Sequence, residues 1–394
     1  MNNFSLLYRL EIRKILSKKS VWIAMAISMV LILMVGFANM SMDGHRDYVK
    51  KQKELLCMIS GNSIDDAFLE EFKNEMKMQI DNNPTFFDKL AAYDSGAVYQ
   101  NAASQIGKAA LYNYLCDVVH DREKVATLTS DEFYKAMREN IIHDGIQLGS
   151  SDEELNTWLK IYDEIEKPIV YSYALAYLNI LNVLYIIGWT LILNISLALA
   201  GTFADEKSYR TDAMILSTKN GHLPVCVAKI AASITIAIIQ SIILIGLCLI
   251  EMFIFYGTTG WNGVIQNVIP SSPWSITIGT MILIYIMLAL VVSILFSITN
   301  MLISLLTKSD VATMAIHAAF IFIGLFNMPG KPGFIYKLWQ LRPTMLLYSA
   351  TFCNTFRYGS MNNVEASILI YSICIIIFIT ILLNTYKRSQ VDSR

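Results

Sequence analysis

The charged residues with the most informative spacing lie in one short segment between two long apolar stretches. Residues 204–229 read ADEKSYRTDAMILSTKNGHLPVCVAK, with acids at the start and bases spread through the rest. Asp205 and Glu206 follow Thr202 in the T-x-x-D pattern of a helix N-terminus, where acidic side chains suit the positive end of the helix dipole. Such a segment can form ion pairs and dock a protein partner, or it can be a solvated loop with a helix on the membrane surface.

Isolated polar residues inside the apolar stretches form a second set of candidates. They are Asn194, Glu251, Asn300 and His317. Intramembrane polar residues are functional candidates because they are costly to bury in lipid, although Asn and His also hydrogen-bond neighbouring helices. No Cys or His residues occur at the compact spacing of a metal-ligand set, so no metal site is predicted.

The composition places these residues in a membrane protein. Of the 394 residues, 55% are hydrophobic and 16% are charged, whereas a soluble domain carries about 25% charged residues. A helix needs about 20 apolar residues to cross a bilayer, and six stretches qualify: 21–38, 180–203, 230–255, 275–295 (or to 303), 311–328 and 364–383. None alternates with the two-residue period of a membrane barrel. We therefore predict an all-α polytopic membrane protein with six transmembrane helices.

The N-terminal residues 1–20 are predicted to form an amphipathic helix at the membrane interface. Phe4, Tyr8, Ile12 and Ile15 give it an apolar face beside basic residues, as in helices that lie on anionic membranes. The apolar stretch that follows is longer than the 7–15 residues of a signal-peptide core. Residues 21–39 are therefore predicted to be the first transmembrane helix rather than a cleaved signal.

The distribution of Lys and Arg predicts that both termini are cytoplasmic. Short loops on that side carry extra basic residues, as do the N-terminal segment, the loop at 204–229 and the C-terminal tail, whereas residues 256–274 contain none. The loop at about 329–363 is an exception, because after five crossings it has to lie outside. Its basic residues are Lys331, Lys337, Arg342 and Arg357.

A large insertion, residues 40–172, is predicted to be an extracellular domain between the first and second spans, with the other five spans in residues 173–394. It contains 24 acidic and 14 basic residues, and long domains cross the membrane regardless of charge. Cys57 and Cys116 could form a disulfide here, which their spacing cannot decide. The three histidines of the insertion are scattered and do not predict a metal site.

Sequence patterns in this insertion predict helices. Thr129 with Glu132, and Ser151 with Glu154, form capping boxes, in which two orphan backbone N–H groups at a helix start are satisfied reciprocally. Each box precedes an apolar stripe at helical spacing. The stripes are Phe133, Met137 and Ile141 after the first box, and Leu155, Trp158, Leu159 and Tyr162 after the second, with a third at Leu69, Phe72, Met76 and Ile80.

The segment at 204–229 resembles the coupling region of membrane subunits in type-2 ABC exporters, the ABCG-like permease class. In that class an acidic–basic start precedes Gly-Thr, a leucine-rich turn and a Lys before the third span. Here Glu206 and Lys207 match the start, AMILS at 213–217 matches the leucine-rich part, and Lys229 matches the final Lys. The sequence departs from the pattern at Arg210, where Gly is usual, and at Lys219, where Pro is common.

The resemblance implies that a coupling helix at about 205–217 docks a separate ATPase subunit. The residues that it assigns to this contact are Asp205, Glu206, Lys207, Tyr209, Arg210, Thr211 and Leu216. It also implies a second permease subunit, identical or related, with a pathway between the two subunits lined by the second and fifth spans. Asn194 and His317 then rank above Asn300 and Glu251 as pathway residues.

The same resemblance implies ATP-driven export of a lipid-like or peptide substrate. Bacterial permeases with a large insertion after the first span resemble those of peptide-antibiotic immunity systems, and a bacterial plasma membrane is the expected location. The chain has no phosphate-binding G-x-x-x-x-G-K-[ST] motif. It is therefore predicted to bind no cofactor itself and to be no enzyme, with ATP and Mg on the partner ATPase.

Two other functions remain open from the sequence. The insertion could read a ligand in a sensor or receptor, and an intramembrane enzyme is the second alternative. The enzyme is disfavoured because the sequence contains neither HExxH nor GxSxG. Nucleic acid is not expected as a partner, because the net charge is −1 and there is no basic domain.

Overall fold

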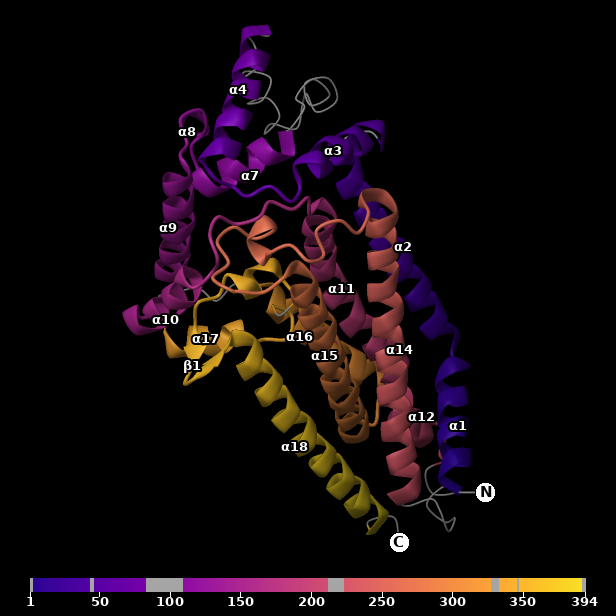
Figure 1. Ribbon diagram of the computed structural model, residues 1–394. Helices are drawn as coiled ribbons and strands as arrows, with labels where there is room; N and C mark the ends of the chain where they lie inside the picture. The colour runs from indigo at the N-terminus through magenta and orange to yellow at the C-terminus, as the bar shows by residue number, and fades with distance from the viewer. Residues whose placement is uncertain are drawn as a thin grey trace.

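The computed structural model describes residues 3–42, 46–82, 109–211, 223–326, 333–345 and 347–391. It shows a bundle of long helices with a smaller helical domain at one end (Figure 1). Both chain termini lie at the opposite end of the bundle. We call that end the terminal end, and the end that carries the small domain the distal end.

Long apolar helices form the bundle, as an all-α membrane protein requires. In lipid a helix is favoured because it satisfies its own backbone hydrogen bonds. The bundle helices are α2 (Lys19–Met42), α11 (Leu175–Leu199), α14 (Leu223–Tyr256), α15 (Ile278–Thr307), α16 (Asp310–Leu325) and α18 (Asn363–Val391). The predicted all-α fold is confirmed, and Pro224 lies in the first turn of α14, where its missing N–H costs nothing.

Five of these helices are long and apolar enough to cross a membrane, and α16 is shorter. Its 16 residues rise about 24 Å at 1.5 Å per residue, less than the roughly 30 Å of a hydrocarbon core. The predicted fifth span at 311–328 extends beyond the observed helix. The helix ends at Leu325, and the backbone of Phe326 is extended.

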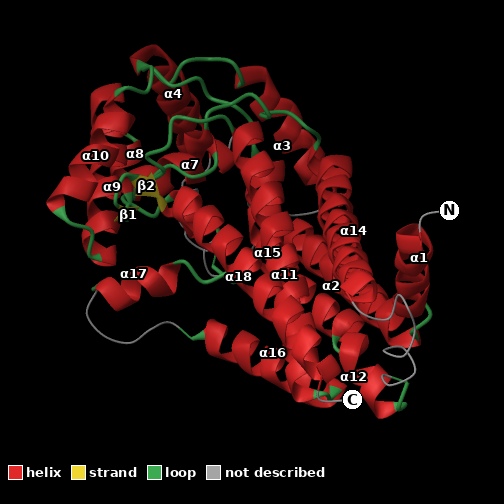
Figure 2. Ribbon diagram, turned by 90° about the horizontal axis from the view of Figure 1, so that it is seen from below, coloured by secondary structure: helices red, strands yellow, loops and turns green. Residues whose placement is uncertain are grey.

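The N-terminal helix α1 (Asn3–Leu16) lies along α14, beside the bundle (Figure 2). The Tyr8 hydroxyl is 2.9 Å from Thr235 Oγ1 on α14. Ile15 is buried, and Tyr8 and Ile12 pack against the core of the bundle. The apolar face that the sequence predicts for the membrane interface thus packs largely on protein.

The distal domain has a hydrophobic core of its own. Its helices are α3 (Arg46–Ile59), α4 (Asp66–Asn82), α7 (Ala109–Val119), α8 (Arg122–Val125), α9 (Ser130–Leu148) and α10 (Asp152–Asp163). Both predicted capping boxes are confirmed, at Thr129 before α9 and at Ser151 before α10. Both predicted stripes after them are buried. In the third stripe Leu69 and Phe72 are buried, and the side chains of Met76 and Ile80 lie outside the described part.

Short elements close the distal end of the bundle. They are η2 (Ile265–Asn267), α17 (Phe334–Gln340), η3 (Ser349–Phe352) and the antiparallel strands β1 (Arg357–Tyr358) and β2 (Met361–Asn362). In this hairpin Arg357 pairs with Asn362 and Tyr358 with Met361. Cys57 and Cys116 are thiols rather than a disulfide, and Cys57 Sγ lies 4.0 Å from Thr259 Oγ1.

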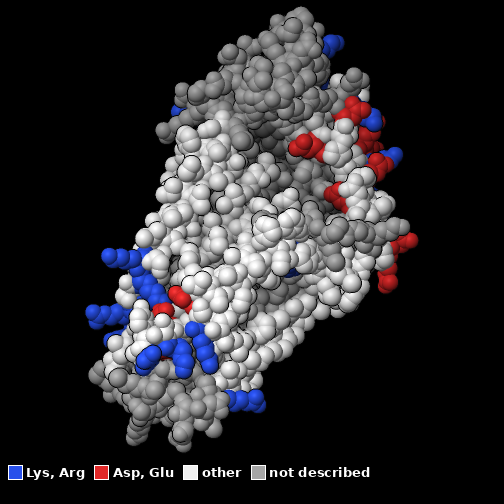
Figure 3. Space-filling model, turned by 180° about the vertical axis from the view of Figure 1, so that it is seen from behind, with Lys and Arg blue, Asp and Glu red and all other residues white. Residues whose placement is uncertain are grey.

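The surface separates into zones of different charge. On the face shown in Figure 3, Lys and Arg gather at the terminal end, while Asp and Glu gather at the distal end. A belt with almost no charged side chains lies between them. This pattern fits helices whose middle lies in lipid, because charged side chains are expensive there.

Candidate functional site

The predicted coupling segment lies at the terminal end, next to a group of ion pairs that joins three helices. This ionic cluster consists of Glu11 and Lys14 from α1, Lys18 after α1, Asp205 and Glu206 from α12 (Gly201–Ser208), and Lys229 from α14. Its members are separated by up to 218 residues in sequence. Side chains that are distant along the chain therefore meet at one place.

Lys229 is the centre of the cluster, and its side chain is 0% exposed. Its ammonium group donates to Glu206 Oε1 at 2.6 Å, to the backbone oxygen of Thr202 at 3.1 Å and to Glu11 Oε2 at 3.2 Å. An ammonium has three N–H donors, so this one is fully satisfied. The Phe203 ring, 5.4 Å away, adds a cation–π contact.

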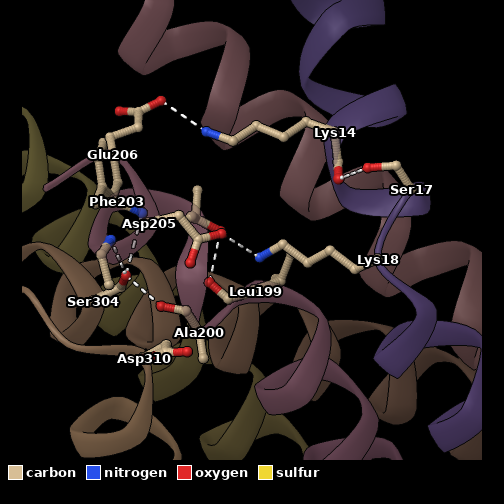
Figure 4. A network of polar contacts seen from close by, with 12 residues as sticks. Lys14, Ser17, Lys18, Leu199, Ala200, Phe203, Asp205, Glu206, Ser304 and Asp310 are labelled. Atoms are coloured by element: carbon tan, nitrogen blue, oxygen red, sulfur yellow. Dashed lines mark hydrogen bonds and ion pairs between the residues drawn. The ribbon is translucent and has the colours of Figure 1, made fainter. Parts of the chain in front are cut away.

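Two further ion pairs attach Lys14 of α1 and Lys18, two residues after α1, to α12 (Figure 4). Lys14 Nζ lies 2.9 Å from Glu206 Oε1, so Glu206 bridges two lysines. Lys18 Nζ lies 2.8 Å from Asp205 Oδ2. These pairs are more open to solvent: the Lys14 and Lys18 side chains are 37% and 25% exposed.

The joint between α11 and α12 is built around the Ser304 hydroxyl of α15. It donates to the backbone oxygen of Ala200 and accepts from the N–H groups of Phe203 and Ala204 at 3.2 Å and 3.1 Å (Figure 4). A side chain that enters the backbone ladder in this way is a recognised cause of a helix break. Thus α12 is a short helical arm that continues the second span and is held by α15.

The predicted helix start at Thr202 is therefore wrong. The helix begins at Gly201 and ends at Ser208, so Asp205 and Glu206 lie in its second half. Thr202 Oγ1 donates to the backbone oxygen of Leu199 at 2.6 Å instead of capping a helix that starts after it. The helical joint overrides the T-x-x-D pattern because α15 supplies the hydrogen-bond partners that an N-cap would otherwise provide.

The proposed ATPase-contact residues fall into two groups. Asp205 and Glu206 point into the ionic cluster, and Glu206 is buried. Lys207, Tyr209 and Arg210 are exposed, Tyr209 to 77%. After the helix, Arg210 takes a positive φ of 55° and the Thr211 N–H donates to the backbone oxygen of Glu206 at 2.9 Å. Leu216 lies outside the described residues, as do the other residues at 212–217 of the predicted coupling helix.

The four predicted pathway residues are all buried, each on a different helix. Asn194 on α11 donates to Ser28 Oγ on α2 and to its own helix at Thr190 O. Nδ1 of His317 on α16 donates to the backbone oxygen of Thr313 at 3.1 Å, and the His317 ring lies near the Phe296 ring.

The other two are less satisfied. Neither amide atom of Asn300 on α15 has a hydrogen-bond partner in the described part of the chain, and neither has Oε2 of Glu251 on α14. The Glu251 carboxyl packs on Gly36 of α2, where an added Cβ would lie 2.4 Å from Oε2. Among the described contacts, no hydrogen bond or ion pair connects the four residues to one another.

Sequence reasoning missed several residues of the cluster. Glu11, Lys14 and Lys18 are spaced by three and four, which places them on one face of a helix. That spacing could have indicated a charged contact face, but the basic residues of this segment were used only to predict its orientation in the membrane. Ser304 carries no local signal, because a serine within an apolar helix is also common in plain helix packing.

A second polar junction joins the distal domain to α17 and β1. Glu154, the capping-box residue of α10, accepts from Lys337 Nζ at 2.6 Å and 2.7 Å, and from the N–H of Arg357 at 2.8 Å. Burial alone would raise the pKa of Glu154, but the hydrogen bonds from Lys337, Ser151 and Arg357 outweigh it, so the pKa lies below its usual value. The carboxylate is thus held charged at this junction.

An open cavity of about 530 Å³ lies beside this junction. It is lined by the end of α9, the distal end of α11, α17 and the segments around Ile269 and Cys353. Its polar lining includes Asp144, Asn182 and Gln340, and its apolar lining includes Leu178 and Ile269. No group of metal-ligating side chains occurs in the described part of the chain.

Comparison with known proteins adds one finding to this geometry. The family model described as ABC-2 family transporter protein matches residues 6–389. Comparison with curated proteins and with solved structures gives no match. The matched region contains the helical bundle, the distal domain and the ionic cluster. The chain therefore belongs to the ABC-2 family of transporter membrane proteins.

Proposed function

We propose that this chain is one permease half of an ATP-driven exporter for a lipid-like or peptide substrate, of the kind that confers immunity to peptide antibiotics. Members of the ABC-2 family are membrane subunits without an ATP-binding domain, and ATP is hydrolysed by a separate ATPase subunit. ATP and Mg would accordingly be bound by that subunit. The exporter would lie in a bacterial plasma membrane with both termini and the ionic cluster in the cytoplasm.

The observation that carries this proposal is the triple contact of buried Lys229 with Glu206, Glu11 and the Thr202 backbone. It ties α1, the arm α12 and the start of α14 into one body. A force applied to the loop after α12 would then move α11 and α14 together, because each is continuous with or bonded to this body. Such a rigid connection is what transmission from a docked ATPase to the spans needs.

The docking surface would be the exposed part of the segment rather than the whole of it. Lys207, Tyr209 and Arg210 are open to solvent, and we assign the ATPase contact to them together with Thr211 and Leu216. Asp205 and Glu206 would act by holding the arm in place. Acids and bases in this segment would therefore have different roles: Asp205 and Glu206 face the protein, and Lys207 and Arg210 face outward.

The substrate would pass between two copies of this chain, or between it and a related subunit. Asn194, His317, Asn300 and Glu251 are the candidates for lining that path, and the unsatisfied amide of Asn300 is costly to leave unpaired. A two-state bundle of this kind needs only a few kcal/mol of bias from the ATPase contact to change its preferred state.

The test uses the full chain co-expressed with its ATPase subunit and reconstituted into vesicles. ATP-dependent movement of a fluorescent phospholipid and of a labelled amphipathic peptide is followed for the native chain and for the double variant Tyr209→Ala/Arg210→Ala. We expect the variant to bind less ATPase and to lose transport, while Arg13→Ala, which removes an exposed charge from α1, retains both. Unchanged ATPase binding in the double variant would contradict the proposed surface, and equal movement without ATP would contradict the proposed function.

A further inference from the structure

The loop between α16 and α18 carries positive charge without any acid of its own. The sequence contains no Asp or Glu between Asp310 and Glu365, but it has Lys331, Lys337, Arg342 and Arg357 there. Lys337 is paired with Glu154 of the distal domain. Arg357 donates from Nη2 to the backbone oxygen of Ser360 near the surface. Arg342 is different, because it is buried.

The Arg342 guanidinium has donors without acceptors. The residue is 8% exposed, and its Nη1 donates to the backbone oxygen of Trp339 at 3.0 Å. Its Nε and Nη2 have no hydrogen-bond partner among the described residues, and no carboxylate there forms an ion pair with it. A guanidinium keeps its charge under all physiological conditions, so the site cannot relieve this burial by losing a proton.

Three more unpaired donors lie in the same region. Trp339, whose ring is 4.9 Å from the Arg342 guanidinium, has an unpartnered indole N–H. Thr344 Oγ1 and the Trp189 indole N–H are also buried without a partner in the described part. A single unpaired polar group needs no ligand to explain it, but a cation, two indole N–H groups and a hydroxyl, all without partners in the described part, point to a missing ligand.

Contacts around Gly324 show that these groups converge from separate elements. A Cβ on Gly324 of α16 would lie 3.1 Å from Thr344 Oγ1 and 3.3 Å from the Trp189 ring of α11. Tyr185, one turn before Trp189, contacts the Trp189 ring and interacts electrostatically with Arg342. The Trp189 atom nearest to Gly324 is ring carbon Cη2. The end of α16, the middle of α11 and the loop after α17 thus meet in one region, which contains these unpaired groups.

The surroundings indicate what kind of molecule would supply the missing acceptors. The short helix α17 exposes Phe334, Ile335 and Leu338, by 75%, 65% and 46%. Apolar side chains exposed beside a buried cation and two tryptophans are typical of the boundary between lipid tails and headgroups. Among common anions, phosphate fits best, since its oxygens can accept from a guanidinium in a bidentate manner and from further donors at once.

We propose that Arg342 binds the phosphate of an anionic lipid-like amphiphile at the distal end of the bundle, with Trp339, Thr344 and Trp189 as additional donors. The acyl part of that molecule lies along the exposed face of α17. The site explains part of the basic loop that does not fit the charge rule, because Lys337 serves the contact with the distal domain and Arg342 serves binding. It does not depend on the proposed ATP-driven export, since binding requires neither ATPase nor nucleotide.

Native mass spectrometry of the full chain in a neutral detergent tests this site. Phosphatidylglycerol, phosphatidylcholine and inorganic phosphate are titrated separately onto the native chain, Arg342→Gln and Arg357→Gln. The last variant is the matched control, because it removes the same charge from the same loop at a group with a backbone partner. We expect Arg342→Gln to bind phosphatidylglycerol at least about tenfold more weakly, as loss of charged hydrogen bonds implies, and Arg357→Gln to stay within about twofold of the native chain.

A second variant covers the case in which Arg342→Gln does not fold. Trp339→Phe keeps the ring under the guanidinium and removes only the indole N–H, so severalfold weaker phosphatidylglycerol binding is expected. Unchanged binding in both variants would overturn the proposal, as would an equal loss in Arg357→Gln. Tight binding of inorganic phosphate alone would overturn the lipid source. Loss of a dimer in Arg342→Gln, with lipid binding retained, would assign Arg342 to a carboxylate of a second copy instead.

Discussion

The ionic cluster makes a sharp prediction for Glu206→Gln, which keeps the shape of the side chain and removes its charge. The contacts of Lys229 with Glu206 and Glu11, at 2.6 Å and 3.2 Å, correspond to gross attractions of roughly 6 and 5 kcal/mol at an effective dielectric constant of 20. The substitution therefore removes about half of the compensation for a fully buried ammonium. Removing one partner of a buried pair costs about 3–5 kcal/mol, and we expect about 3 kcal/mol here because Glu11 remains.

The assay is equilibrium unfolding of the full chain in mixed micelles with increasing SDS, followed by tryptophan fluorescence. Asp205→Asn is the matched control on the same helix, because it breaks the pair with Lys18. Both of those side chains are more exposed, 22% and 25%, so the expected loss is below about 1 kcal/mol. The contrast between the two variants tests whether burial decides the contribution of an ion pair here.

A double-mutant cycle isolates the pair itself. Lys229→Met alone leaves Glu206 with Lys14 only, whereas the combination of Glu206→Gln and Lys229→Met removes the buried charge altogether. Glu11 keeps its charge in the combined variant, but its side chain is 15% exposed and can be solvated. We therefore expect the combined variant to be less destabilised than either single variant, since apolar replacement of a buried pair is often neutral. Equal losses for Glu206→Gln and Asp205→Asn, or additive losses in the combined variant, would refute this reasoning.

Three further predictions concern the joint and the distal domain. Ser304→Ala should destabilise the chain by about 1–3 kcal/mol, because the N–H of Ala204 loses its acceptor in a buried place, and hydrogen exchange should become faster at that amide; unchanged exchange would contradict the role of the hydroxyl. Thr129→Ala should cost about 1 kcal/mol through loss of the cap of α9, measured as a lower SDS midpoint for the distal domain. The contact of Glu154 with Lys337 should be present above the usual carboxyl pKa of 4.5 and lost as the pH falls through the lower pKa of the folded protein. Limited proteolysis across that range should show the opening, and Glu154→Gln should abolish its pH dependence.

Local patterns predicted the helices well, because the interactions that form a helix and its caps join residues close together in the sequence. The run that forms α15 is mostly apolar and contains no charged residue, and a helix is the local structure that both buries such a run in lipid and pairs its backbone. The capping boxes at Thr129 and Ser151 were found because their hydrogen bonds span three residues. The boundary of α16 was missed, because the apolar pattern continues past Leu325 while the backbone is already extended at Phe326.

At Thr202 the local T-x-x-D pattern gave a wrong helix start, because Thr202 lies within α12, which begins at Gly201. The competing hydrogen bonds come from Ser304, about 100 residues later in the chain. The functional interpretation changed with it, because Glu206 was expected to face a partner and instead lies against Lys229 and Lys14. A family resemblance pointed to this segment but could not say which way its side chains point.

By itself, the sequence determined the membrane class, the helical content, the caps of the distal domain and the placement of charge at the ends of the helices. These follow from partition between water and lipid and from hydrogen bonds within a few residues. Both effects can be judged from a short stretch of sequence. Tertiary structure alone decided that Glu11 and Glu206 share one buried lysine, that Ser304 breaks a helix, and that Arg342 is buried without an acid. Those outcomes depend on how distant helices pack, because an ion pair or an orphaned charge is a property of what lies opposite, and no local pattern encodes that.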